Sequence, residues 1–200
     1  MGERNMITKP SIYVTDKEVN RDVFSKTLSV PIDTINEILD AITYATLMHG
    51  NQKRRHTNEP YITHCISVLK HTLNYTNSLN ACLIAILHDT VEDTDASIDD
   101  IRAQWGYDVS EGVNILTNTP TTQGLNRIRR KSIGRARTSE STDIIQTIRM
   151  FDILDNIPSL RKYESYFFNT VFKKEVIDDI LAFDKVDTTL SFKVLAELNK

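Results

Sequence analysis

The sequence predicts an all-α protein, built as a bundle of helices, from three observations. Only six Gly and five Pro occur in 200 residues, so few positions interrupt a helix. Apolar residues recur mostly at helical spacing, and the strict alternation typical of strands is scarce. A hydrophobic content of 40% can fill the core of one domain of this length. We therefore expect one helical domain over residues 31–200 and an N-terminal extension over residues 1–30, where no strong apolar period occurs.

Each helix is expected where the apolar period agrees with a start or stop signal. Pro31 can open the first helix, because proline is favoured in a first turn. A second helix is expected from about Tyr61. Ser97 and Asp100 have the form of a capping box, which would start a short helix that Gly106 can end. The other expected helical segments are 80–93, 109–116, 125–136, 142–156 and two or three amphipathic stretches that reach Leu198.

Composition excludes several classes of protein. A net charge of −3 argues against a general nucleic-acid binder. No apolar run approaches the roughly 20 residues of a membrane-spanning helix, and the N-terminal residues lack the apolar core of a secretory signal. Cys65 and Cys82 are the only two thiols, which argues against a disulfide framework and fits a reducing compartment. We therefore expect a cytoplasmic protein that binds neither membranes nor nucleic acid.

The most informative motif is a group of ionisable residues that follows the apolar run 81–87. His88, Asp89, Glu92 and Asp93 lie within six positions, so in a helix they would be one turn apart in pairs. A solvated helix end with chance acidic residues is the alternative, but the preceding run is almost wholly apolar, and burying these groups would cost stability. Imidazole and carboxylate are ligands for divalent ions, and an adjacent carboxylate can take a proton from water. The motif predicts a metal-dependent hydrolase.

Two further segments can complete such a site. His64 lies early in the second expected helix, after a polar, basic loop over residues 50–60. Asp152 follows an apolar stretch, with Asn156 one turn later on the same face. Taken alone, Asp152 would be an ordinary exposed carboxylate. His49 is a rival early histidine, for which a structural role near the site is favoured.

The order of these groups, histidine first, His-Asp in the middle and Asp last, is that of the HD metal-dependent phosphohydrolases. More narrowly, residues 59–64 (EPYITH), 87–94 (LHDTVEDT) and 149–156 (RMFDILDN) resemble the hydrolase domain of the RelA/SpoT-type alarmone enzymes. The match spans about residues 41–160 and leaves no room for a synthetase domain, so the chain is similar to the stand-alone small alarmone hydrolases. The resemblance implies an HD-domain helical bundle over 31–200. It also implies Mn²⁺-dependent removal of the 3′-pyrophosphate of (p)ppGpp, which yields GDP or GTP and pyrophosphate.

The resemblance implies a role for each matching residue. Glu92 and Asp93 match the catalytic pair that positions and activates the attacking water. Four residues match the ligands of a single divalent ion: His64, His88, Asp89 and Asp152. Four others match groups that contact the nucleotide: Arg54, Arg55, Asn156 and Ser159.

The chain also departs from the usual family pattern around these residues, which leaves the identity of the nucleotide open. The altered positions are the loop 55–59, Cys65, Phe151, Ile153 and Asp155. One alternative is the same chemistry on another phosphorylated nucleotide, such as a related signalling nucleotide or NADPH. Another is a non-catalytic protein that senses a nucleotide through an HD pocket.

Two segments each allow two interpretations, and two histidines are expected to have no special role. The basic segment 127–137 can be a solvated helix face or a phosphate-binding rim over the pocket. The aromatic residues between Tyr163 and Phe172 can be core or a self-association face, which leaves a homo-oligomer open. His56 and His71 are expected on the surface.

Overall fold

The computed structural model describes residues 32–117 and 124–200, and it confirms the all-α prediction for them. Within these two ranges the only β pairing is an isolated bridge between Lys53 and Pro60, which closes the basic loop. No helix in these ranges is long and apolar enough to cross a membrane. The N-terminal extension expected over residues 1–30 lies outside the described residues.

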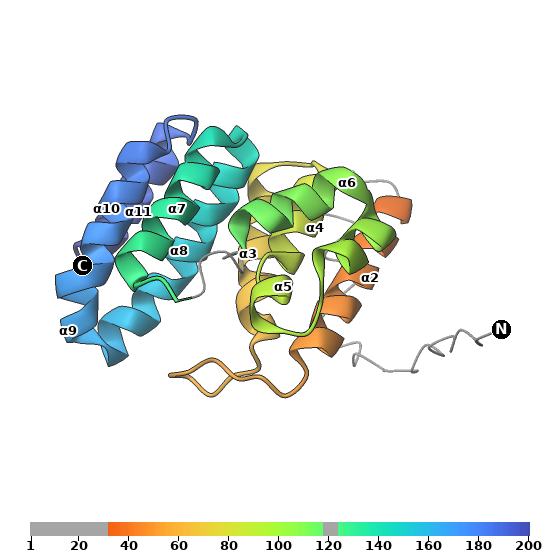
Figure 1. Cartoon of the computed structure of the whole chain (residues 1–200), viewed down its shortest axis with the longest axis horizontal. Coiled ribbons are helices and arrows are strands. Elements are labelled where there is room, and N and C mark those ends of the chain that lie inside the picture. Colours follow the sequence, from red (N-terminus) through yellow and green to blue (C-terminus); the bar gives the residue numbers. More distant parts are fainter. Residues whose placement is uncertain (1–31, 118–123) are drawn as a thin grey trace.

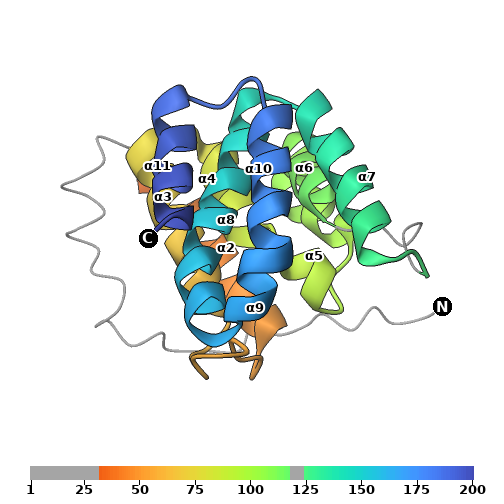
Figure 2. The ribbon, with the colours of Figure 1, turned by 90° about the vertical axis from the view of Figure 1, so that its left-hand side faces the viewer.

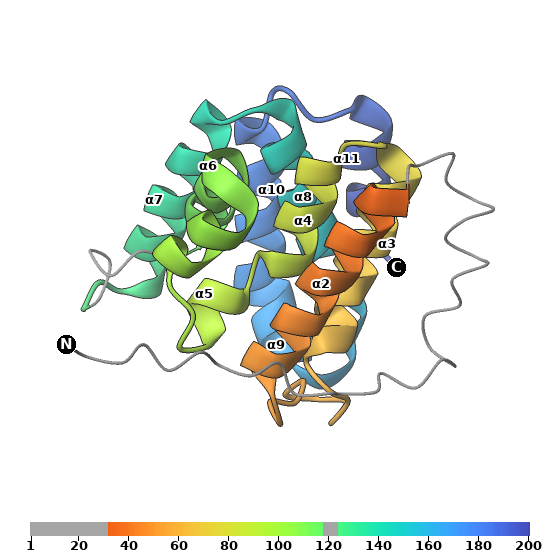
Figure 3. The same ribbon diagram turned by 90° about the vertical axis from the view of Figure 1, so that its right-hand side faces the viewer.

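The first half of the described chain packs around one buried helix, α4 (Leu79–Leu87). All residues from Ala81 to Leu87 are buried, as expected for a helix that is apolar on every side. It contacts its neighbours on several sides (Figures 1 and 3). The helices packed on it in this half are α2 (Ile32–His49), α3 (Ile62–Tyr75) and α6 (Ile98–Leu116), and the short α5 (Thr90–Asp93) packs on α2 and α6.

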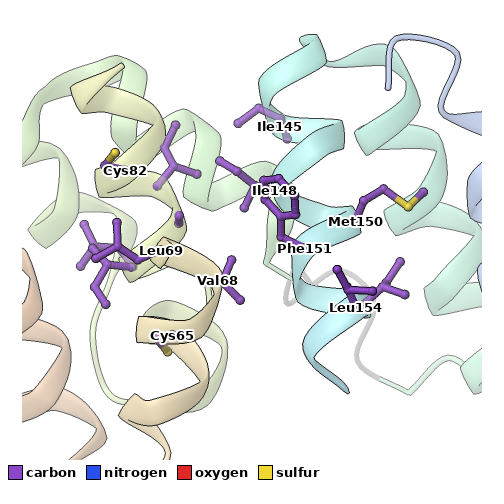
Figure 4. Close-up of a cluster of buried hydrophobic side chains, with 14 of the residues drawn as sticks. Cys65, Val68, Leu69, Cys82, Ile145, Ile148, Met150, Phe151 and Leu154 are labelled. Carbon is purple, nitrogen blue, oxygen red and sulfur yellow. The ribbon is translucent and has the colours of Figure 1, made fainter. Parts of the chain in front are cut away.

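The second half is arranged around α8 (Asp143–Tyr163), which packs on α3 as well as on its own neighbours (Figure 2). Ile148 and Phe151 of α8 point towards α3 and α4, where Val68 and Cys82 lie in the same core (Figure 4). The remaining elements are α7 (Arg127–Glu140), α9 (Ser165–Phe167), the π-helical turn η2 (Phe168–Phe172), α10 (Lys173–Ala182) and α11 (Thr188–Leu198).

The prediction of a single helix over 80–93 is wrong in detail. Helix α4 ends at Leu87, and the short α5 begins at Thr90. Between them His88 and Asp89 keep near-helical backbone angles (φ −56°, ψ −37° and φ −96°, ψ −7°). The break follows from the side chains, because both turn into the same buried cluster, described below, instead of lying along one helix face.

The expected signals around α6 are confirmed. The Ser97 hydroxyl accepts a hydrogen bond from the Asp100 backbone N–H, and the Asp100 carboxylate accepts one from the Ser97 N–H, so the capping box is complete. Gly106 interrupts the helix with a φ of 84°, a conformation that glycine adopts easily. The chain resumes the helix immediately and α6 continues to Leu116.

The C-terminal aromatic residues differ in burial. Phe168 is only 1% exposed and belongs to the core, whereas Tyr166 is 82% exposed. Self-association through this surface stays a prediction.

Candidate metal centre

Four side chains from three separate segments meet in one buried cluster. His64 comes from the start of α3, His88 and Asp89 from the α4–α5 junction, and Asp152 from the middle of α8. The Nε2 atom of His64 lies 3.2 Å from Asp152 Oδ1 and 3.4 Å from Asp89 Oδ2. His88 Nε2 lies 3.1 Å from Asp89 Oδ2. The ligand atoms of His64, His88 and Asp89 all fall within 4.8 Å of one another, which is compatible with one ion.

The hydrogen bonding of His88 shows that this donor set fits a metal. Its Nδ1 atom lies 2.9 Å from the Ala85 carbonyl oxygen, and because a carbonyl can only accept, Nδ1 carries the proton. The buried Nε2 atom makes no hydrogen bond within the described residues, although the Asp89 oxygen is close. A buried imidazole whose Nδ1–H is fixed by a backbone carbonyl and whose Nε2 atom faces a carboxylate has the arrangement of a metal-ligating histidine.

His64 is held in a similar way, by a partner that sequence reasoning missed. Its Nδ1 atom lies 2.7 Å from Asp155 Oδ2, which leaves Nε2 facing Asp89 and Asp152. A carboxylate behind a ligand histidine fixes the orientation of the ring and raises its basicity. In the sequence Asp155 is only a departure from the usual family pattern, and its position one turn before Ser159 gives no sign of this contact.

The carboxylates of the cluster strongly favour positive charge on the groups beside them. Burial lowers the pKa of His64, but hydrogen bonds to Asp152, Asp155 and Asp89 outweigh it and raise the pKa to about 12. Burial opposes ionisation of Asp152, yet Arg149 and His64 hold the pKa of its carboxyl below the usual range. Without a metal these carboxylates retain protons on the imidazoles. A divalent cation can supply the same charge.

The two acidic residues predicted to activate water lie at the edge of the cluster. Glu92 is exposed and lines the main cavity together with Asp89 and Asp152. Burial and the nearby charges of Asp89 and Glu92 raise the pKa of the Asp93 carboxyl, which makes it a better proton acceptor. The Tyr61 hydroxyl donates a hydrogen bond of 2.7 Å to Asp89 Oδ2. Tyr61 belongs to a motif quoted above, but its link to Asp89 could not be seen in the sequence.

A cavity of about 480 Å³ opens over the cluster, and side chains of both charges line it. We call Asp89, Glu92 and Asp152 the acidic wall. We call Arg127, Lys131 and Arg149 the basic wall. A smaller cavity of about 190 Å³ adjoins it. Five residues line both cavities: Arg55, Tyr61, Asn156, Leu160 and Glu164.

The four residues predicted to contact the nucleotide all line the smaller cavity. Arg54 is largely buried, and its guanidinium pairs with Asp155 at 2.8 Å and donates to Asn156 Oδ1 at 3.4 Å. The side chain of Arg55 is 81% exposed and pairs with Glu164 at 3.1 Å. Asn156 donates to Asp152 Oδ1 at 2.8 Å, so its amide connects the cavity with the ligand cluster.

The basic segment 127–137 combines the two interpretations offered for it. Arg135 and Arg137 serve the fold: Arg135 pairs with Asp179 at 2.6 Å, and Arg137 donates to backbone carbonyls at the end of α6. Lys131 lines the main cavity and forms no ion pair within the described residues. Arg149, burial and Arg127 lower the pKa of Lys131 to about 8.

Two other histidines do not belong to the ligand cluster. The surface position expected for His56 is wrong, because its ring stacks on Tyr163 at 5.5 Å and its side chain is only 18% exposed. His49 stays outside the ligand cluster. It is buried, its Nδ1 atom contacts Gln52 Oε1 at 2.7 Å, and its Nε2 atom lies near Cys65.

Comparisons with known proteins agree with this geometry. The model of the HD domain family matches residues 41–151. The chain is 29% identical over 162 residues to the guanosine-3′,5′-bis(diphosphate) 3′-pyrophosphohydrolase MESH1 of Drosophila melanogaster, covering 72% of this chain and 84% of the relative. It is 30% identical over 130 residues to human MESH1, covering 63% of this chain and 70% of the relative.

A solved structure supports the same relationship. It is described as a metazoan ortholog of SpoT that hydrolyses ppGpp, and it matches with a TM-score of 0.69 and 25% identity. The match covers 82% of this chain and 94% of that protein. The chain therefore belongs to the HD domain family, and within it to the group that contains the stand-alone guanosine-3′,5′-bis(diphosphate) 3′-pyrophosphohydrolases.

Proposed function

We propose that the protein hydrolyses the 3′-pyrophosphate of ppGpp and pppGpp, releasing GDP or GTP and pyrophosphate, with Mn²⁺ as its ion. One observation carries the proposal: a buried cluster of two imidazoles and two carboxylates lies under a cavity that is also lined by three basic side chains. Such a cavity suits a substrate that carries several phosphates and reacts beside a metal. The names of the relatives indicate the same bond and the same nucleotide.

In this proposal His64, His88, Asp89 and Asp152 hold the ion. Imidazole and carboxylate together accept Mn²⁺, and neither donor type selects strongly against it. A bound divalent ion supplies Lewis acidity towards a phosphoryl oxygen and acidity towards water. The Ala85 carbonyl and the Asp155 carboxylate keep the two imidazole rings oriented.

Glu92 and Asp93 are the proposed proton acceptors for the attacking water. Both lie within four positions of the ligand Asp89, and Glu92 lines the main cavity. The water attacks the phosphorus bound to the ribose O3′ and its proton passes to a carboxylate. The O3′–P bond breaks, and the departing O3′ takes up a proton to become the 3′-hydroxyl. The basic wall balances the charge that develops on the phosphoryl oxygens.

The remaining predicted residues hold the nucleotide. Arg54, Arg55, Asn156 and Ser159 line the smaller cavity beside the ligand cluster. Asp155 is proposed to act through His64 and Arg54, which it contacts. A cytoplasmic location fits Cys65 and Cys82, both of which are buried as free thiols.

The first test is a product assay. Protein stripped of metal is incubated with ppGpp, with and without Mn²⁺, and the nucleotides are separated by ion exchange. We expect GDP and pyrophosphate only when Mn²⁺ is present. Bound Mn²⁺ without turnover of ppGpp would refute the proposed substrate, and a panel with adenosine analogues and NADPH would then follow. Failure to turn over any nucleotide would favour the non-catalytic sensor.

A further inference from the structure

Glu164 occupies an unusual position between the two cavities. It follows the last residue of α8 and precedes α9, with non-helical backbone angles (φ −129°, ψ 47°). Its side chain is 22% exposed and lines both the main and the smaller cavity. It lies outside the residues matched by the family model and outside the motifs from which site residues were predicted.

The contacts of Glu164 leave part of its carboxylate unused. Its Oε1 atom lies 2.8 Å from His56 Nε2 and 3.1 Å from the Arg55 guanidinium. Both of these contacts are made by Oε1, and Oε2 accepts no hydrogen bond within the described residues. Because an ionised carboxylate only accepts hydrogen bonds, this oxygen suits a ligand that presents N–H or O–H donors.

The two cavities differ in the ligand groups that they suit. The main cavity contains all three basic-wall residues and the acidic wall, so it suits the phosphates and the ion. The described lining of the smaller cavity includes none of these six residues, and it carries the flat ring of His56, which stacks on Tyr163 with an angle of 11° between the rings. Planar side chains are suitable neighbours for a nucleobase. The two arginines of the smaller cavity, Arg54 and Arg55, are already paired with Asp155 and Glu164, and a carboxylate there would attract the donors on a base edge.

We propose that Glu164 recognises the Watson–Crick edge of guanine in the smaller cavity and thereby sets the base specificity of the enzyme. Guanine presents two neighbouring donors, N1–H and the 2-amino group. One can donate to Oε2, and the other can take the place of the exposed Arg55 at Oε1. Adenine presents an acceptor at N1 and would leave one carboxylate oxygen facing a lone pair. The inference rests on the proposed function, because a guanosine nucleotide is the substrate named there.

The test compares the binding of three diphosphates by calorimetry in the presence of Mn²⁺. GDP offers both donors, IDP lacks the 2-amino group, and ADP lacks both donors at these positions. For the wild type we expect GDP to bind roughly 10- to 100-fold more tightly than ADP, with IDP between them. In E164Q the preference for GDP over ADP should collapse, because a glutamine amide can both accept and donate.

Glu197→Gln is the matched control. Glu197 has a similarly exposed side chain (23%) and pairs with Arg161, but it lines neither cavity. E197Q should keep the wild-type order of the three nucleotides. A melting curve for each variant separates a loss of fold from a loss of recognition.

Three outcomes would overturn the inference. An equal loss of affinity for all three diphosphates in E164Q would mean that Glu164 only shapes the cavity or contacts the ribose. Unchanged affinities would mean that it serves only to pair with Arg55 and His56. A wild type without preference for GDP over ADP would also refute it. Because binding is measured separately from turnover, a failure of ppGpp hydrolysis would refute the proposed function without deciding this inference.

Discussion

The acidic wall and the basic wall line the same cavity, yet they are built in different ways. Two of the three acidic residues, Asp89 and Glu92, come from one short motif, and Asp152 is held by Arg149 and Asn156 at 2.7 and 2.8 Å. The basic wall is assembled from α7 and α8, and Lys131 forms no direct ion pair within the described residues. The acidic wall is therefore organised before any ligand arrives. The basic wall contains a cation that a phosphate would neutralise.

The difference predicts different consequences of mutation. Ligands on the acidic wall are interlocked, so removing one should abolish metal binding. Cations on the basic wall repel one another, which is why the Arg149 charge, with burial, lowers the pKa of Lys131. A polyphosphate would relieve this repulsion, so a change on the basic wall should weaken substrate binding and leave the metal in place.

The largest expected effect separates two neighbours on the acidic wall. Asp89→Ala should abolish both metal binding and turnover, because Asp89 contacts both histidines of the cluster. Glu92→Ala should retain the metal but lose roughly 10²–10⁴-fold in kcat, the usual contribution of a proton acceptor. Metal analysis of the purified variants and steady-state kinetics measure the two effects. Equal metal content and equal residual activity in both variants would contradict this division of roles.

The next effect tests the basic wall. Lys131→Met should lower kcat/KM for ppGpp by roughly 10- to 100-fold, because a charge-assisted contact with phosphate is lost, and metal content should not change. Arg129→Met is the matched control, since Arg129 is exposed on the same helix and lines neither cavity. If both variants lose the same activity, the effect comes from net charge and not from a phosphate contact.

A smaller effect is expected where the metal cluster and the nucleotide-binding residues meet. Asp155 contacts both His64 and Arg54, so Asp155→Asn should weaken Mn²⁺ binding by about tenfold and also raise KM. Titration of stripped protein with Mn²⁺ measures the first effect, and initial rates at saturating Mn²⁺ measure the second. Asp184→Asn is an exposed control. A variant with altered KM but unchanged metal affinity would show that Asp155 serves only Arg54.

The acidic wall could be predicted from the sequence because most of its ionisable residues lie close together in the chain. Carboxylates and an imidazole after the run 81–87 have few structural explanations, and the motifs at His64 and Asp152 follow in the family order. The break between α4 and α5 could not be predicted, because local periodicity continues through it. Only the tertiary contacts of His88 and Asp89 turn the backbone there.

The basic wall could be predicted only in part, because a run of arginines does not reveal which ones find partners. Asp179 and two carbonyls that engage Arg135 and Arg137 lie far away in the chain. Lys131 differs from Arg135 and Arg137 in its three-dimensional surroundings, but nothing in the neighbouring sequence distinguishes it from them. Glu164 and His56 were missed for the same reason, since their pairing depends on a loop meeting the end of α8.

The smallest expected effect concerns two adjacent arginines that the sequence treats alike. Arg55 is 81% exposed, so Arg55→Met should leave the melting temperature almost unchanged, because exposed ion pairs contribute little to stability. Its KM should rise by only about threefold, and that rise should shrink as salt is added. Arg54 is 15% exposed and bonded to Asp155 and Asn156, so Arg54→Met should lower stability and raise KM further at every salt concentration. Equal effects in the two variants would show that charge alone matters in this loop, and that the buried pairing of Arg54 adds nothing to it.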